Sequence, residues 1–257
     1  MTAALHAEWT KLRTLASTFW LLAATAALTF AVSAAAAAAT RCPSGHCAAD
    51  PAKISLTGIY LGQVVVAVLA VIAVSGEYGT GMIRVTLTAM PRRITVLAAK
   101  GAILAGLVLA SGTVAVLPSL LAGQLILPGH GLGPAKGYPA LSLGDGAVLR
   151  AAAGSALYLC LIALLSVGVA AAVREAAAAI ATVLGLLFLF PVIGAAVGAS
   201  LSRHIDQIAP MTAGLAIQAT TNLSSLPISP WAGLGVLAAW TAGALLLGGT
   251  LLHLRDA

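Results

Sequence analysis

The sequence predicts an all-α membrane protein with six transmembrane helices, and two observations support this fold class. Hydrophobic residues make up 60% of its 257 positions and charged residues only 8%, whereas a soluble domain carries about 25% charged residues. Uncharged apolar runs also recur at lengths suited to spans of roughly 20 residues. Such a composition cannot build a water-exposed surface, so membrane lipid must surround most of the chain. We expect spans at 19–39, 56–75, 94–126, 147–173, 176–199 and 230–254.

Residues 1–18 are expected to form an amphipathic helix lying in the membrane interface. Lys11 and Arg13 point away from its apolar face, toward anionic lipid, and an unstructured basic flank is the alternative. We expect the following span to remain a membrane helix and not to be cleaved as a signal peptide. The apolar face repeats at helical intervals and comprises Leu5, Trp9, Leu12, Ala16 and Phe19.

Small residues, a proline and two glutamines distinguish individual spans. Gly58 and Gly62 are spaced for close helix contact, as are Gly194 and Gly198 in the fifth span. The third span is too long for one straight crossing, so it should tilt, kink at Pro118 or extend beyond the membrane. The main polar side chains expected at depth, besides Ser and Thr, are Gln63 and Gln124.

Residues 76–93 form a polar, basic segment between two uncharged runs, which suggests that it faces a soluble partner. Gly79 and Gly81 permit a sharp turn, and a short helix at 83–87 should end at Pro91. Glu77 needs a reason other than topology, because acids contribute little to orientation; a partly desolvated pair is expected, with Arg84, Arg92 or Lys11 as its partner. The alternative is that the cations only anchor the topology, namely Arg92, Arg93 and Lys100.

The loops on the other face are less regular. Cys42 and Cys47 bracket the segment CPSGHC and are a possible external disulfide, while a metal site that includes His46 is a weak alternative. Residues 128–146 are rich in Gly and Pro and should be irregular. Residues 200–229 are apolar but broken by prolines, so we expect a re-entrant or interfacial segment. The chain is expected to be one domain, 1–257.

Orientation follows from the basic residues. The face with the termini receives eight Lys and Arg residues and the other face five. This excess predicts cytoplasmic N- and C-termini in a plasma membrane. The positive charge does not indicate a nucleic-acid partner, because no soluble basic domain is present.

The sequence lacks the residues that several activities of membrane proteins require. No His or Asp sits deep within a span beside a Ser, so we expect no catalytic residues and no enzyme activity. The chain has no G-x-x-x-x-G-K-[ST] phosphate loop, and its spans lack the buried carboxylates of ion-coupled carriers. These features favour an amphiphilic or apolar cargo moved by energy from another chain.

Three segments resemble the membrane subunit of an ABC-2 type exporter of the actinobacterial kind. They are HAEWTKLRT before the first span, GEYGTGMIRVTLTAMPRRITVLAAK between spans two and three, and IAPMTAGLAIQ before the last span. The resemblance implies a permease dimer, homo- or heteromeric, in a bacterial plasma membrane. It further implies two separate cytoplasmic ATP-binding subunits, which would carry the ATP and Mg; this chain itself would bind no cofactor and no metal.

The resemblance also assigns roles to residues. An N-terminal elbow helix would include Glu8, Trp9, Lys11 and Leu12. A membrane anchor or sensor that recruits a cytoplasmic partner without transport is the alternative function, since the same basic loop would serve it. The loop that couples to the ATP-binding subunit would comprise Glu77, Tyr78, Gly79, Gly81, Arg84, Pro91, Arg92 and Arg93.

Overall fold

The fold, a computed structural model, is 85% helical. The residues that it describes are 2–14, 16–42, 47, 49–79 and 93–255, and they contain no β-strand. Six helices are long and apolar enough to span a membrane, as predicted. They are α2 (Ala16–Ala39), α4 (Ile59–Gly79), α6 (Arg93–Ile126), α7 (Gly146–Val173), α8 (Ala176–Ala196) and α11 (Pro230–Arg255).

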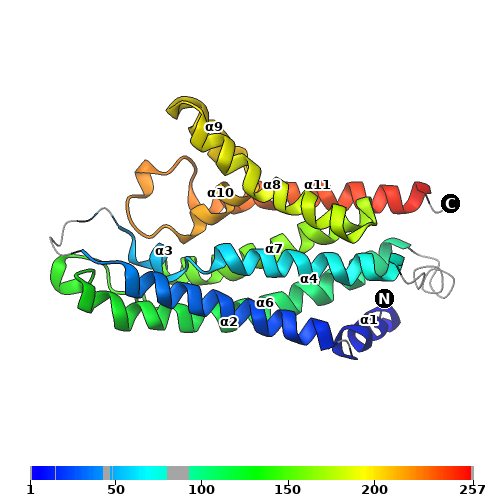
Figure 1. Ribbon diagram of the computed structural model, residues 1–257, viewed down its shortest axis with the longest axis horizontal. Helices are drawn as coiled ribbons and strands as arrows, with labels where there is room; N and C mark the ends of the chain where they lie inside the picture. Colours follow the sequence, from blue (N-terminus) through cyan, green and yellow to red (C-terminus); the bar gives the residue numbers. More distant parts are fainter. Residues whose placement is uncertain (1, 15, 43–46, 48, 80–92, 256–257) are drawn as a thin grey trace.

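The long helices run along the molecule, so the connections gather at two opposite ends (Figure 1). One end, here called the terminal end, holds the N-terminal helix α1 (Thr2–Thr14), the last turn of α4 and the chain's C-terminus. The opposite end, the disulfide end, holds the segment around Cys42 and the short helices α3 (Pro51–Ser55), η1 (Leu127–His130) and η2 (Pro134–Lys136).

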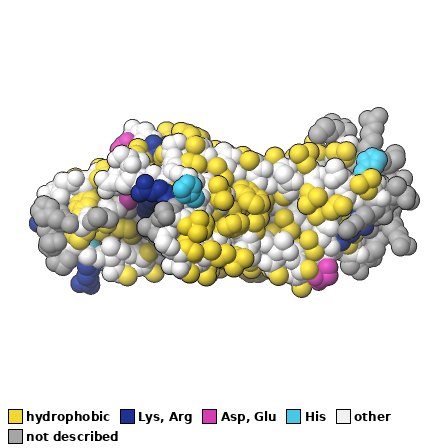
Figure 2. Space-filling view, turned by 90° about the horizontal axis from the view of Figure 1, so that it is seen from above, with side chains coloured by type: hydrophobic (Ala, Val, Ile, Leu, Met, Phe, Trp, Pro, Cys, Tyr) yellow, Lys and Arg dark blue, Asp and Glu magenta, His cyan; other side chains and the backbone are white. Residues whose placement is uncertain are grey.

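Helix α7 lies at the centre of the bundle. In its most apolar 18-residue stretch 61% of residues are buried, against 17% in the corresponding stretch of α8. The outer helices therefore expose large apolar side chains, such as Leu125 on α6 and Leu189 on α8. Figure 2 shows apolar side chains over the middle of one face and charged ones toward its two ends, the pattern expected of a protein surrounded by lipid.

Small residues let the helices approach closely. A Cβ at Gly58 would collide with the carbonyl oxygen of Thr29, and one at Gly62 with the Thr29 hydroxyl, so this predicted glycine pair does face α2. A Cβ at Gly168 would meet the backbone of α11 at Ala244, a contact that the sequence did not suggest. Gly194 has only side chains of α9 nearby, and Gly198 has open space.

Several helix ends differ from the predicted spans: α2 begins at Ala16 and not at residue 19, and α8 ends at Ala196 and not at residue 199. Helix α4 continues to Gly79 instead of ending at residue 75, so Glu77 and Tyr78 lie in its last turn and not in a loop. Helix α6 contains Pro118 and stays one helix from Arg93 to Ile126. The third span thus keeps its predicted bounds to within one residue and is not broken at Pro118.

The segment 200–229 folds mostly into short helices. Its second helix is buried: Gly214 lies against Tyr158 of α7 and Leu237 of α11. Helix α10 and η3 therefore pack on protein, as irregular membrane backbone requires, whereas α9 extends away from the bundle (Figure 1); the position of the segment relative to a bilayer stays a prediction. The elements are α9 (Ala199–Ile208), α10 (Pro210–Leu215), η3 (Ala216–Gln218) and η4 (Leu223–Ser225).

Candidate functional site

Four charged side chains form a closed ring at the terminal end. Lys11 Nζ lies 2.9 Å from Glu8 Oε1 and 3.0 Å from Glu77 Oε1. Lys100 Nζ lies 2.5 Å from Glu8 Oε2 and 2.9 Å from Glu77 Oε1. Each acid therefore contacts both bases, and the signs alternate around the ring. This ionic ring joins α1, the last turn of α4 and the start of α6.

The ionic ring is largely removed from water. The side chains of Glu8, Lys100 and Glu77 are 3%, 6% and 10% exposed, whereas Lys11 is 28% exposed. Removing charges from water costs several kcal/mol per ion, and close opposite charges with good geometry offset that cost. Two acids and two bases also leave the ring without net charge. Loss of any one member would leave a buried charge incompletely compensated.

Lys11 shows the balance of these effects. Burial by itself would lower the pKa of Lys11, but hydrogen bonds and the negative charges of Glu8 and Glu77 outweigh it, and the pKa is raised above the usual 10.5. The ammonium form is therefore the one that the ring stabilises.

Local sequence explains how the ring forms. Glu8 and Lys11 are three residues apart on α1 and so share one helix face. That face turns toward the bundle, which leaves Trp9 45% exposed. The expectation that Lys11 points to lipid was thus wrong, because two carboxylates attract it inward. Lys100 is also more than a topological anchor, since it is buried between Glu8 and Glu77.

A second contact ties the other helices to this end. The guanidinium of Arg174 lies 5.4 Å from the ring centroid of Tyr78 and donates a hydrogen bond to the carbonyl oxygen of Leu251 at 3.3 Å. Arg174 has φ 68° and ends α7, and Glu175 begins α8 by accepting hydrogen bonds from Ala177 and Ala178. These two hydrogen bonds lower the pKa of the Glu175 carboxyl. The α7–α8 turn is thereby joined to α4 and α11.

The remaining predicted coupling residues have varied positions. Gly79 ends α4 and Arg93 begins α6, while Leu12 lies within α1. The predicted helix at 83–87 is outside the described residues, as are four of the coupling residues. Of the three partners expected for Glu77, Lys11 is in contact; the other two are among these four, Gly81, Arg84, Pro91 and Arg92.

The sequence did not indicate the contact between Lys100 and Glu8, because 92 positions separate them. The available signal was a balance of charge, with an acid and a base three positions apart in the N-terminal helix, one acid after the second predicted span and one base at the start of the third. Only the fold brings these elements to the same point.

Cys42 and Cys47 are bonded as a disulfide at the opposite end. The Tyr138 hydroxyl donates to the carbonyl oxygen of Cys47 and accepts from its N–H, both at 2.8 Å. Among the residues that the structure describes, no group of three His, Cys, Asp or Glu side chains could hold a metal. His46, which the alternative metal site would need, lies outside them.

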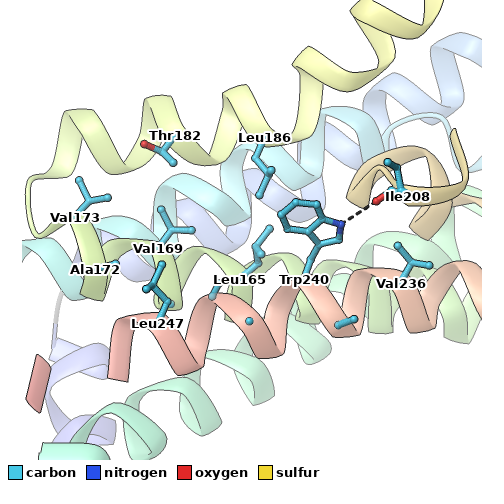
Figure 3. A pocket seen from close by; sticks show the side chains of 14 residues that line it. Leu165, Val169, Ala172, Val173, Thr182, Leu186, Ile208, Val236, Trp240 and Leu247 are labelled. Atoms are coloured by element: carbon cyan, nitrogen blue, oxygen red, sulfur yellow. Dashed lines mark hydrogen bonds between the residues drawn. The ribbon is translucent and has the colours of Figure 1, made fainter. Parts of the chain in front are cut away.

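An apolar groove of 630 Å³ runs between α7, α8 and α11. Leu186 and Trp240 point into it from facing helices, and the Trp240 indole N–H donates to the carbonyl oxygen of Ile208 at 2.8 Å (Figure 3). The hydroxyl of Thr182 on its wall already donates to the carbonyl oxygen of Ala178. The groove thus favours apolar groups, because its wall leaves few hydrogen-bonding side-chain groups unused.

Comparison with known proteins adds no family assignment: no protein-family model matches the chain, and no curated protein matches it either.

Proposed function

We propose that this chain is the membrane-spanning permease subunit of an ATP-driven ABC exporter. It would form part of the translocation path and couple to a separate ATP-binding subunit at the terminal end, which would be cytoplasmic. Two permease chains, identical or not, would assemble with two ATP-binding subunits, and ATP and Mg would bind to the latter. The support is the resemblance of three segments together with the ionic ring.

The ionic ring carries the proposal. The segment 80–92 leaves α4 just after Glu77 and enters α6 just before Lys100, so the ring ties together both helices that flank it. The same ring holds α1 through Glu8 and Lys11. A push on 80–92 would therefore move three helix ends as one body. Arg174 extends that connection to α7, α8 and α11.

The cargo expected from this proposal is amphiphilic or apolar. The groove beside Trp240 supplies an apolar surface within the spans, and charged side chains are sparse there. A cargo with an apolar part would gain free energy from contact with such a wall.

The direct test replaces Glu77 in the complex that co-purifies with the protein from mild detergent. Glu77→Gln keeps the side-chain shape but removes the charge, so Lys11 and Lys100 share only Glu8. We expect membrane insertion and subunit assembly to persist, while ATP-dependent transport falls about fivefold or more relative to ATP hydrolysis. The measurement is ATPase activity and transport in the same proteoliposomes.

Glu175→Gln is the matched control, because Glu175 is an exposed acid at the same end and glutamine can still accept hydrogen bonds for α8. It should leave coupling unchanged. Normal coupling in Glu77→Gln would remove the ring from the mechanism. Recovery of a soluble partner without any ATPase would instead support a membrane anchor or sensor.

A further inference from the structure

A pocket of 380 Å³ with both polar and apolar lining residues lies at the disulfide end, apart from both the ionic ring and the groove. Three stretches of the chain form it: residues 53–60 of α3 and the start of α4, residues 206–218 from α9 to η3, and residues 226–228. This volume falls within the range typical of small-ligand sites, about 300–1,000 Å³. Its polar walls distinguish it from the groove, and they include Lys53, Thr57, Tyr60, Asp206, Thr212 and Gln218.

Side-chain hydrogen bonds fix each wall in place. Asp50 accepts from the backbone N–H of Thr220 at 2.6 Å and of Thr221 at 3.0 Å, which ties the 216–228 region to α3. Gln207 Nε2 donates to the carbonyl oxygen of Pro227 at 2.8 Å, which ties the same region to α9. These hydrogen bonds lie outside the pocket lining apart from Pro227, but they tie together the stretches that form it, which favours a preorganised site.

Two opposite charges line this pocket without neutralising each other. Lys53 and Asp206 are both half-buried, yet within the described part of the chain neither side chain forms an ion pair. They differ in this from the four charges of the ionic ring, each of which has a partner of opposite sign. A cation and an anion kept apart across one pocket instead leave a gap that a ligand with both charges would fill.

We propose that this pocket binds a small zwitterion that carries a primary ammonium group and a phosphate, as phosphoethanolamine does. The Lys53 ammonium would hold the phosphate, for which lysine is a common ligand. The Asp206 carboxylate accepts only, so it would take hydrogen bonds from the ligand's ammonium. On the same wall the Tyr60 hydroxyl offers a further polar contact, and the Thr57 hydroxyl, which donates to the carbonyl oxygen of Lys53 at 3.1 Å, can still accept a hydrogen bond. This site does not depend on the transport function proposed above.

The ligand chemistry has two sources, the free zwitterion and the headgroup of a phospholipid, and two measurements separate them. Isothermal titration of the purified full-length protein with phosphoethanolamine tests the free form. Native mass spectrometry after exposure to equal amounts of phosphatidylethanolamine, phosphatidylcholine and phosphatidylglycerol tests the lipid. We expect binding of at least one ethanolamine form, with phosphatidylcholine disfavoured because its ammonium has no N–H to donate.

Lys53→Met and Asp206→Asn each remove one charge at similar volume. Each should weaken binding at least about tenfold, since hydrogen bonds to charged groups are among the strong ones. Lys136→Met is the matched control, because Lys136 is exposed at the same end and does not line the pocket; it should bind as wild type does. Failure of both ethanolamine probes to bind would overturn the proposal, and so would binding that neither pocket substitution weakens.

Discussion

The two ends of the molecule are held together by different interactions. At the terminal end, α1, α4 and α6 meet through the ionic ring, in which every contact joins full charges. At the disulfide end, the Cys42–Cys47 bond, the Tyr138 hydroxyl and the Asp50 carboxylate hold loops to helices. Most of those contacts end on backbone N–H or C=O groups. One end thus joins helices to one another, while the other fixes irregular backbone.

This difference bears on function. Buried ion pairs have a large desolvation cost, so their net contribution depends on geometry and is lost steeply when one member moves. Hydrogen bonds to backbone N–H and C=O groups, together with a disulfide across a short loop, restrict the conformations that this loop can adopt. An end built from ion pairs suits concerted helix movement, and an end built from loop clamps suits a fixed rim with a preformed pocket.

The largest expected effect comes from removing Lys100. Lys100→Met preserves the length of the side chain but leaves Glu8 and Glu77 dependent on Lys11 alone. Breaking a buried pair typically costs 3–5 kcal/mol, and the remaining base should hold the loss near the lower value, about 3 kcal/mol. The free energy of unfolding in mixed micelles, followed by SDS titration, measures it. Lys136→Met, an exposed lysine on η2, should change stability little.

Equal losses in these two variants would show that the ring contributes no more than a surface charge. Release of α1 alone, detected as a change in Trp9 fluorescence without global unfolding, would instead narrow the role of Lys100 to docking that helix.

A smaller loss is expected at the disulfide end from Asp50→Ala. Asp50 caps α3 through Ala52 and also accepts three hydrogen bonds from Thr220 and Thr221. Asp145→Ala removes a comparable cap from α7, where the carboxylate accepts only from Ala147. Loss of an N-cap costs about 1 kcal/mol. We expect Asp50→Ala to lower the free energy of unfolding by about 1–2 kcal/mol more than Asp145→Ala does, and this difference would be the contribution of the hydrogen bonds from Thr220 and Thr221 to Asp50, here called the clamp.

If the two aspartate variants unfolded at the same SDS concentration, the clamp would contribute nothing to stability. Because the hydrogen bonds of Asp50 tie residues 220 and 221, which lie between two stretches of the pocket lining, to α3, Asp50→Ala should weaken phosphoethanolamine binding as well, and Asp145→Ala should not.

Most of the fold was predictable because lipid imposes long uncharged helices. The spans and the Gly58–Gly62 contact follow from runs and spacings that lie within a few turns of sequence. The extension of α4 to Gly79 could not be predicted in this way, because Gly79 and the polar residues before it resemble a loop in the sequence. In the structure, ion pairs stabilise Glu77 within the helix. A local sequence pattern does not reveal a stabilising contact that comes from a helix elsewhere in the chain.

The candidate sites divide in the same way. The sequence indicated that Glu77 needs a partner and offered Lys11 among three. It gave no reason to connect Glu8 with Lys100, or to place Lys53 and Asp206 in one pocket, because both depend on how helices far apart in the chain pack. Charge balance within a composition of few charges was the signal present, and it becomes specific only when the topology is known.

The smallest expected effect is a loss of stability at high pH, and it concerns the terminal end, where Lys11 belongs to the ionic ring. The pKa of Lys11 is raised in the folded protein, so its contribution to stability is fully present below its unfolded value, near 10.5, and is lost as pH rises through the folded value. Because Lys11 is partly exposed, solvent screening makes this loss smaller than either substitution above. Lys11→Arg keeps its charge in this range, so wild type should lose more stability than Lys11→Arg between pH 10 and 11.5. Parallel loss in both proteins would mean that the docking of α1 does not depend on the charge of Lys11, and that Glu8 and Glu77 are held at this end by Lys100 alone.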